Sequence, residues 1–376
     1  MSKLSTKRKK LALTSVIASL VALSVLAIAA TIGLSSSITS ASGSATGAAF
    51  IIDNAASGNN VWVYARASDG SLSLVGPIAT NGLGTGSGLG SQGALALTPD
   101  GHWLLVVDAG SNEISVFAVH GTTLTFAGKA SSQGSDPVSL TINRNLVYVL
   151  DASGTGNIAG FWLSSTGILT YISGSNRPLS GQASPSPEEI GFNPDGNVLL
   201  VTEKATNTID VYTVNSAGVA SAPTSVPSVG SGPYAFVYTD HNQLLLSEAA
   251  TGTLTSYVVS DNGQLRVISG AIPTFGLAPC WIVVTNEGQF VYTANAHGGT
   301  ISSFSVSRTG GLTLFSSIAA HTTIPALDMA FSRNSQFLYV RNGNAITGYR
   351  VFEDGSIVSI TSASGTPSSA AGLVAV

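Results

Sequence analysis

The chain has 376 residues, of which 42 are Gly and 14 are Pro, while only 9% are charged and 7% aromatic. Small and β-branched residues are abundant and strong helix formers are scarce, which predicts many short strands joined by tight turns. This composition excludes a helical bundle. The single cysteine, Cys280, excludes an intrachain disulfide and a zinc site built from several thiolates.

The charge is unevenly distributed. Five of the 15 basic residues lie in the first ten positions, which leaves 10 basic against 19 acidic residues and a net charge of −9 for the rest of the chain. Such a body repels nucleic acid and anionic lipid, because both carry negative charge. We therefore expect no nucleic-acid partner.

The N-terminus has the pattern of an export signal. An uncharged apolar run from Leu11 to Leu34 follows the basic cluster, and small residues from Ser35 to Ala49 offer cleavage sites. The run is also long enough to span a bilayer, so an uncleaved anchor is the alternative. The positive-inside rule places the body outside the cytoplasm in both cases. We expect residues 1–47 to be a signal peptide or membrane anchor with a linker, and the protein to be secreted or anchored to the membrane only there.

Beyond residue 48 a pattern recurs in which several apolar residues lead to a polar one, a turn follows, and an alternating strand comes next. The polar residues that end the seven apolar runs are Asp53, Asp108, Asp151, Glu203, Glu248, Asn295 and Arg341. Successive members are 55, 43, 52, 45, 47 and 46 residues apart, close to the ~40 to 50 residues of a four-stranded propeller blade. The pattern predicts an all-β fold, a seven-bladed β-propeller over residues 48–376. A β-helix or two β-sandwiches are the alternatives.

The flanking sequences fit four-stranded blades. Asp69-Gly70, Asn262-Gly263 and Asp354-Gly355 predict tight hairpin turns. A further apolar strand precedes six of the seven runs and is missing before Asp53. We expect Ala371 to Val376 to supply it and to close the first blade, because closure removes exposed strand edges.

Three segments carry a family resemblance: Ala109-Gly110-Ser111-Asn112-Glu113-Ile114-Ser115-Val116-Phe117, Val201-Thr202-Glu203-Lys204-Ala205-Thr206-Asn207 and Ser247-Glu248-Ala249. In these the sequence resembles the seven-bladed lactonase-like propellers, a family that includes 6-phosphogluconolactonase and the carboxymuconate-cyclising enzymes. The resemblance extends from residue 48 to the end of the chain. It implies a propeller fold and an activity that opens or forms a lactone.

The resemblance also implies a set of catalytic groups. These are a histidine at the start of one inner strand, an arginine in the next blade, a glutamate ending that blade's second strand, and an arginine in the blade beyond. Here Glu188 replaces the histidine, Tyr234 stands in place of the first arginine, and Ala294-Asn295-Ala296 lacks the second. Glu248 matches the glutamate. Because lactone chemistry needs a proton donor or acceptor and a cation for the developing anion, the implied catalytic set is degenerate.

The seven polar residues occupy equivalent positions, so we expect their side chains at one level around the central channel. Five carboxylates with one cation nearby fit a ligand or a hard cation such as Ca²⁺, and their mutual repulsion would raise the pKa of one of them. The alternative is that each acid accepts hydrogen bonds from backbone N–H groups in the following turn. The candidate catalytic residues are Glu248 and Glu203, and the candidate substrate-binding residues are Tyr234, Arg341, Lys204, Asn295 and Trp281.

Three other features have structural interpretations. Gly88-Leu89-Gly90-Ser91-Gln92-Gly93 matches a dinucleotide fingerprint, but it precedes a strand rather than a helix, so we interpret the stretch Gly82 to Gly93 as an interblade loop. Cys280 is interpreted as a small buried residue. Trp281 either stacks on a ring-shaped ligand or packs between blades.

Two functions fit the sequence. The first is an exported, monomeric lactonase-like hydrolase that acts on a lactone or sugar-like ligand, with Glu248 as acid and base. The second is a non-catalytic propeller that binds a small molecule, a glycan or a protein. The retained glutamate and the whole-chain resemblance favour the first. The missing arginines favour the second, as does export, which separates the protein from cytoplasmic phosphorylated sugars.

Overall fold

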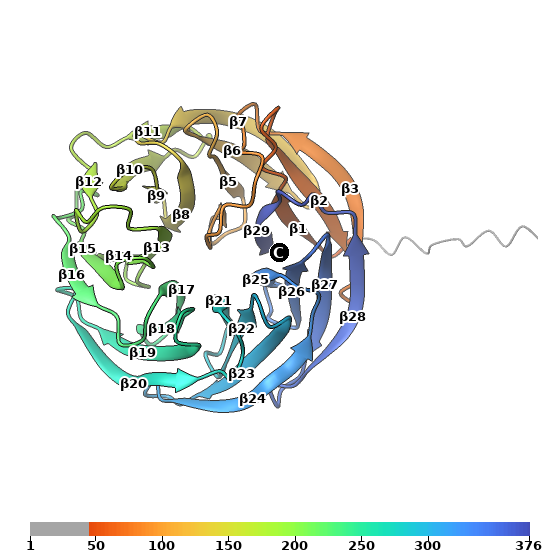
Figure 1. Cartoon of the computed structure of the whole chain (residues 1–376). Coiled ribbons are helices and arrows are strands. Elements are labelled where there is room, and N and C mark those ends of the chain that lie inside the picture. The colour runs from red at the N-terminus through yellow and green to blue at the C-terminus, as the bar shows by residue number, and fades with distance from the viewer. Residues whose placement is uncertain (1–44) are drawn as a thin grey trace, which may run out of the picture. The chain divides into compact units, whose positions relative to one another are not determined.

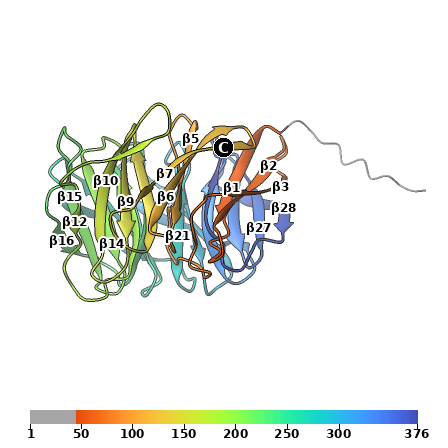
Figure 2. The same cartoon turned by 90° about the horizontal axis from the view of Figure 1, so that it is seen from above.

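The computed structural model describes residues 45–376 and shows seven antiparallel sheets arranged as blades around a central channel (Figure 1). This confirms the predicted all-β, seven-bladed propeller. The predicted signal or anchor segment, Leu11 to Leu34, lies outside the described residues. Within residues 45–376 no helix is long and apolar enough to cross a membrane. Seen from the side, the blade strands run through the thickness of the ring (Figure 2).

The strands of each blade follow one another from the channel outwards, except in the first blade, whose innermost strand comes last in the chain. Blade 1 consists of β29 (Ala371–Ala375), β1 (Gly47–Ile52), β2 (Asn60–Arg66) and β3 (Leu72–Ala79). Blade 2 consists of β4 (Leu95–Leu97), β5 (Trp103–Asp108), β6 (Glu113–His120) and β7 (Thr123–Ser131). Blade 3 consists of β8 (Pro137–Asn143), β9 (Leu146–Asp151), β10 (Asn157–Leu163), β11 (Leu169–Tyr171) and β12 (Arg177–Pro178).

The remaining four blades are regular. Blade 4 consists of β13 (Pro187–Phe192), β14 (Val198–Glu203), β15 (Thr208–Thr213) and β16 (Thr224–Pro227). Blade 5 consists of β17 (Pro233–Tyr238), β18 (Gln243–Glu248), β19 (Thr253–Val259) and β20 (Leu265–Pro273). Blade 6 consists of β21 (Pro279–Val284), β22 (Phe290–Asn295), β23 (Thr300–Val306) and β24 (Leu312–His321). Blade 7 consists of β25 (Ala326–Phe331), β26 (Phe337–Asn342), β27 (Ala345–Val351) and β28 (Ile357–Ser364).

The ring closes where the sequence predicts. Strand β29 pairs antiparallel with β1, and Phe50 lies opposite Val374 in their register. Arg66 on β2 adds a side-chain hydrogen bond of 3.1 Å to the carbonyl of Val376. The last strand of the chain therefore covers the edge of the first, which would otherwise be open to pairing with another chain.

The predicted hairpin turns also form. Gly70, Gly263 and Gly355 connect the third and outer strands of blades 1, 5 and 7, with φ angles of 87°, 80° and 81°. Glycine reaches this left-handed region without a steric penalty, which explains its place in the turns. Buried tyrosines also tie blades together at two of these turns. Tyr339 donates to the carbonyl of Gly70 and Tyr292 to that of Gly355, both at 2.8 Å.

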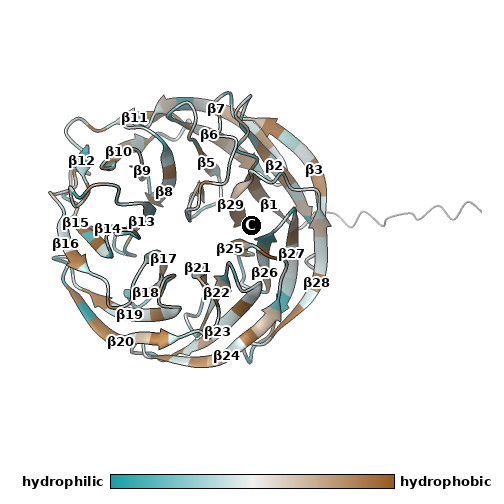
Figure 3. Ribbon diagram, viewed as in Figure 1, coloured by the Kyte–Doolittle hydropathy of each residue, from teal (hydrophilic) through white to brown (hydrophobic). Residues whose placement is uncertain are grey.

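Burial decreases from the second strands to the outer strands. In β9, β14 and β18 every residue is buried, as expected for strands covered on both faces. The outer strands β20, β24 and β28 alternate between apolar and polar residues (Figure 3). The core thus lies between the blades, and the polar residues that end the second strands lie where two blades meet.

Candidate functional site

Five of the seven polar residues, Asp108, Asp151, Glu203, Glu248 and Asn295, end the second strand of their blades, and Asp53 directly follows its second strand. Asp151, Glu203, Glu248 and Asn295 each lie opposite the proline that begins their inner strand. In blade 7 the residue at this position is Asn342, which pairs with Ala326. The placement of Arg341 in the set is therefore wrong by one residue, and the two-residue period of a strand turns its side chain to the opposite face of the sheet.

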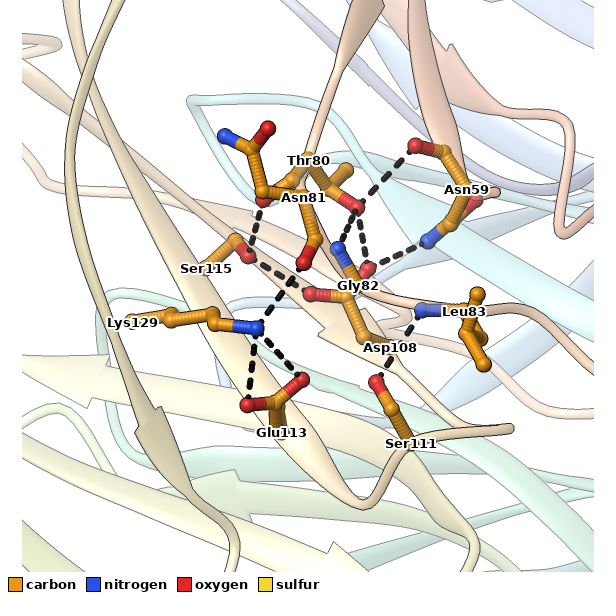
Figure 4. A network of polar contacts seen from close by, with 10 residues as sticks. All are labelled: Asn59, Thr80, Asn81, Gly82, Leu83, Asp108, Ser111, Glu113, Ser115 and Lys129. Carbon is orange, nitrogen blue, oxygen red and sulfur yellow. Dashed lines mark hydrogen bonds and ion pairs between the residues drawn. The ribbon is translucent and has the colours of Figure 1, made fainter. Parts of the chain in front are cut away.

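Asp108, Glu203, Glu248 and Asn295 point into the junction between blades rather than together into the channel, whereas Asp53 accepts hydrogen bonds from its own blade, among them the Ala55 and Asn60 N–H groups at 3.1 and 2.9 Å. Asp108 of blade 2 is fully buried, and its carboxylate accepts hydrogen bonds from Thr80 at 2.5 Å and Asn59 at 2.9 Å, both from blade 1. Ser115 donates to its other oxygen at 2.6 Å. In Figure 4 these side chains enclose Asp108 next to Gly82 of the interblade loop.

A Ser/Thr-x-Gly motif lies in four interblade loops, and in two of them its first side chain donates to the buried acid, Thr80 to Asp108 and Ser228 to Glu248. The four copies are Thr80-Asn81-Gly82, Ser132-Gln133-Gly134, Ser228-Val229-Gly230 and Thr274-Phe275-Gly276. In each copy a methyl group on the glycine would overlap the polar side chain of the next blade. The glycine of the motif therefore lets one blade approach the buried polar residue of its neighbour. Sequence reasoning missed the motif because Ser, Thr and Gly at this spacing do not indicate a catalytic or metal site.

Glu248, the one catalytic match to the family, is held in such a junction. Its carboxylate is fully buried and accepts hydrogen bonds from Ser228 at 3.1 Å and the Gly230 N–H at 2.6 Å. Thr253 and Thr255 of its own blade donate at 2.5 and 2.8 Å. These four donors occupy both oxygens.

Glu203 is placed in the same way in blade 4. It accepts hydrogen bonds from the N–H and hydroxyl of Ser180 at 3.0 and 2.7 Å, and from Thr206 at 2.5 Å. The pKa of Asp210 is raised to about 7, mainly by burial and to a smaller extent by the nearby charge of Glu203. Asn295 is buried in blade 6, where Thr300 and Ser302 contact its amide nitrogen at 2.9 and 2.8 Å.

The expected convergence at one level of the channel is therefore not found. Asp108, Glu203 and Glu248 are surrounded by hydrogen-bond donors of their own junctions. Asp53 accepts backbone N–H bonds from the turn that follows it, as the alternative predicts, and Oδ1 of Asp151 has no hydrogen-bond partner within residues 45–376. In residues 45–376 no three His, Cys, Asp or Glu side chains come together in a way that could hold a metal ion. The expected Ca²⁺ site depended on several carboxylates meeting at one level of the channel, and the structure does not bring them together there.

A different set of residues meets at one end of the channel, which we call the mouth, where the inner strands begin. Lys204 forms an ion pair with Glu188, and its ammonium lies 5.2 Å from the centre of the Tyr234 ring. Arg341 forms an ion pair with Asp328 at 3.1 Å, in which both side chains are 4% exposed. Burial raises the pKa of Glu188 and of Asp328, and the adjacent cation opposes the shift in each case.

A loop covers these residues. Residues 80–94 connect β3 to β4 and contain the glycine-rich stretch, which confirms it as an interblade loop. The Tyr234 hydroxyl donates to the carbonyl of Gly90, and the Trp281 indole N–H donates to that of Ser91 at 3.0 Å. The Gln92 N–H donates to the carbonyl of Glu188 at 3.1 Å. Side chains from two blades are thus used to hold the loop.

Cys280 and Trp281 are buried in this region. Burial raises the pKa of the Cys280 thiol to about 12, so the thiol stays protonated near neutral pH, and its prediction as a small buried residue is confirmed. The Trp281 ring packs edge-on against Tyr234 with centroids 5.1 Å apart. Trp281 is 4% exposed and packs between blades 5 and 6.

Of the predicted site residues, the structure brings together Lys204, Tyr234 and Trp281 at the mouth, with Arg341 paired to Asp328 on the inner strand of blade 7. It places Glu203, Glu248 and Asn295 in three separate junctions. Sequence reasoning missed Asp328, although a charged residue inside an apolar inner strand is a usable signal. It also missed Gln92, whose role depends on how far its loop reaches.

Comparisons with known proteins agree with this fold. The family model described as Lactonase, 7-bladed beta-propeller matches residues 48–173 and 235–328. No curated protein matches the chain in sequence. A crystal structure of a Lactobacillus plantarum protein shares 18% identity over 88% of this chain and 99% of its own, with a TM-score of 0.73.

Two further solved structures have names that describe an activity. A putative 6-phosphogluconolactonase from Bacteroides fragilis is 19% identical over 88% of this chain and 98% of its own, with a TM-score of 0.69. A periplasmic gluconolactonase from Pseudomonas aeruginosa is 16% identical over 88% of this chain and 99% of its own, with a TM-score of 0.67. At these identities the likeness supports the fold, and the match to the family model over more than half of the chain supports membership. The chain belongs to the family of lactonases with a seven-bladed β-propeller.

Proposed function

We propose that this chain is an exported, non-hydrolytic member of the lactonase family that acts by binding a ligand. The observation that carries the proposal is the loop over the mouth. Tyr234 and Trp281 donate hydrogen bonds to the carbonyls of Gly90 and Ser91. The mouth is therefore occupied by the protein's own loop. A lactone would have to displace this loop before it could reach those side chains.

The electrostatics at the mouth support the same proposal. Arg341 and Lys204 are each paired with a carboxylate, Asp328 and Glu188. A developing lactone oxyanion needs an available positive group or N–H donor, and removing one such donor can cost about 10² to 10³ in rate. Both cations would have to leave their partners to serve an anion.

Glu248 is poorly suited to proton transfer where it lies. Its oxygens accept four hydrogen bonds inside the junction of blades 4 and 5, and the residue is fully buried. A general base must come within hydrogen-bond reach of the proton it removes. The carboxylate instead stabilises the contact between the blades.

Hydrolysis of gluconolactone tests the proposal. Acid release by the wild type, Tyr234→Phe and Glu248→Gln is compared with the uncatalysed rate. We expect all three proteins to match the uncatalysed rate. Acid release that scales with wild-type concentration and disappears in Glu248→Gln would overturn the proposal.

A slow lactonase remains the second candidate, favoured by one observation. The Lys204 side chain is 40% exposed beside Tyr234, so it could meet an anionic substrate if the loop opened. Deleting Gly86 to Gly90 would then increase acid release, and Lys204→Met would abolish the increase. No increase on loop deletion argues against this candidate.

Export is proposed from the sequence of the N-terminus, and the Pseudomonas aeruginosa relative, a periplasmic protein by name, is consistent with it. Fractionation of cells that express the full chain, compared with a chain lacking residues 2–34, tests it. We expect the full chain outside the cytoplasm and the shortened one inside. Equal amounts of both proteins in the cytoplasm would contradict export.

A further inference from the structure

The channel has a second end, where the inner strands finish, and a cavity of about 530 Å³ lies there. It is lined by the later residues of five inner strands, β8, β13, β17, β21 and β25. Its volume is within the range of small-molecule sites, which are roughly 300–1,000 Å³. None of the lining residues belongs to the set that meets at the mouth.

Glu189 and Gln92 separate this cavity from the mouth. Glu189 lines the cavity and is 8% exposed. Its Oε1 accepts a hydrogen bond from the Gln92 amide at 3.2 Å, and its Oε2 accepts one from the Phe236 N–H at 2.6 Å. The Oε1 of Gln92 in turn accepts the Ile282 N–H at 3.0 Å. The carboxylate thus lies at the inner end of the cavity, next to the loop that closes the mouth.

The charge of Glu189 has no counterpart in the described part of the chain. Among residues 45–376 it forms no ion pair, and it is the one charged side chain in the cavity lining. Burial raises its pKa to about 8, although the N–H bonds from Phe236 and Gln92 oppose the shift. Both of its hydrogen bonds come from N–H donors, so the ionised form is hydrogen-bonded but not neutralised. Because this pKa lies above 7, Glu189 in the empty cavity is mostly protonated at neutral pH, and a cation placed beside it favours the ionised form.

A second polar group in the same cavity lacks a partner. The hydroxyl of Tyr238 is buried and makes no hydrogen bond within residues 45–376. The nearby charge of Glu189 helps burial to raise its pKa well above the ordinary value, which places the two groups in one electrostatic environment. The rest of the lining is mixed: Ile142, Val284 and Phe331 are among its apolar residues, and Thr141, Asn143 and Asn193 are polar.

We propose that this end of the channel binds a small organic ammonium ion with an apolar body. The ammonium group donates hydrogen bonds to Glu189 and Tyr238, and the hydrocarbon part lies against the apolar walls. An ammonium has three donors, which is enough for both acceptors. The inference rests on the proposed binding function and supplies the chemical class of its ligand.

Binding of 2-phenylethylamine, measured by isothermal titration calorimetry at pH 7, tests the inference. The neutral 2-phenylethanol has the same shape without the charge, and 3-phenylpropionate reverses the charge. We expect the amine to bind at least tenfold more tightly than the alcohol, and the carboxylate not to bind. Equal affinity for amine and alcohol would overturn the inference.

Variants show where the amine binds. Glu189→Gln should weaken binding of the amine at least tenfold while leaving the alcohol unchanged. Asp354→Asn removes an equal charge from an exposed turn and should change neither affinity. Val284→Trp keeps every charge but fills the cavity, and it should weaken both ligands. If Glu189→Gln does not fold, Val284→Trp decides, and unchanged amine binding in that variant refutes the site.

The outcome is independent of lactone hydrolysis. Absence of amine binding together with absence of acid release from lactones would refute this site and leave the non-hydrolytic proposal standing. Amine binding together with lactone turnover would support this site and refute the non-hydrolytic proposal.

Discussion

The Gln92 side-chain amide donates a 3.2 Å hydrogen bond to Glu189 and joins the loop over the mouth to the inner strand of blade 4. The same side chain accepts the Ile282 N–H of blade 6, so it bridges two blades that are not neighbours. One residue therefore connects the closed mouth with the cavity at the other end of the channel.

Gln92→Ala should destabilise the propeller. The substitution removes a donor from a buried carboxylate and leaves the Ile282 N–H without its acceptor, at a cost of about 1–3 kcal/mol for each unsatisfied group. Urea unfolding measures the change in the free energy of unfolding. Gln264→Ala, at an exposed turn, is the matched control and should stay within about 0.5 kcal/mol of the wild type. Equal stability of the two variants would show that the bridge is unimportant.

The propeller should be more stable at pH 5.5 than at pH 8.5. Burial raises the pKa of Asp151 and Asp210 to about 7 and that of Glu189 to about 8. In the unfolded chain these groups titrate near pH 4. Between pH 4 and 8 the unfolded chain therefore loses protons that the folded chain retains, so rising pH favours unfolding in this window.

Melting temperatures across this pH range check the direction. Asp210→Asn should raise the melting temperature at pH 8.5 and reduce its dependence on pH, because the neutral amide needs no charge beside Glu203. Asp261→Asn, at an exposed turn, should change neither. A wild type that becomes more stable as pH rises from 5.5 to 8.5 would contradict the assignment.

Gly230→Ala should destabilise the junction of blades 4 and 5. The new methyl group would overlap the Glu248 carboxylate, which cannot move without losing four hydrogen bonds. Overpacking of this kind typically costs about 1–3 kcal/mol. Gly88→Ala, where nothing lies within 4 Å of the added atom, provides the control for thermal unfolding. If both variants melted at the same temperature, the Ser/Thr-x-Gly motif would lack the packing role assigned to it.

Deleting residues 368–376 should abolish cooperative melting. The deletion removes β29 and exposes the edge of β1, which then becomes free to pair with other chains. Calorimetry and light scattering would detect the lost transition and the aggregation. A truncated chain that melts like the full-length one would contradict closure by the last strand.

The sequence was sufficient to predict the blades, because each blade repeats its own apolar run, turn and alternating strand. It also predicted the closing strand, since one inner strand was missing before Asp53. The exact strand register was harder to predict from the sequence. Arg341 was grouped with the acids although Asn342 holds the equivalent place, because the run in blade 7 ends in two polar residues and only the strand pairing separates them.

The site was harder to predict than the fold. Equivalence between blades correctly placed Asp108, Glu203 and Glu248 at one kind of position, but it did not reveal that their side chains face the neighbouring blade. Their partners, such as Thr80 and Ser228, are more than 15 residues away in the chain, and nothing in the Ser/Thr-x-Gly motif itself indicates which acid it will contact. The path of a glycine-rich loop across the channel is set by long-range hydrogen bonds, which composition does not encode.

Hydrolysis of 6-phosphogluconolactone is the most direct measurement of the central claim that the mouth is closed and does not turn over a lactone. Acid release is followed with increasing wild-type protein and compared with the spontaneous rate in the same buffer. We predict no dependence on protein concentration, because the loop covers Tyr234 and Trp281 and both nearby cations are paired. A saturable rate that grows with protein concentration and is lost in Tyr234→Phe would contradict it.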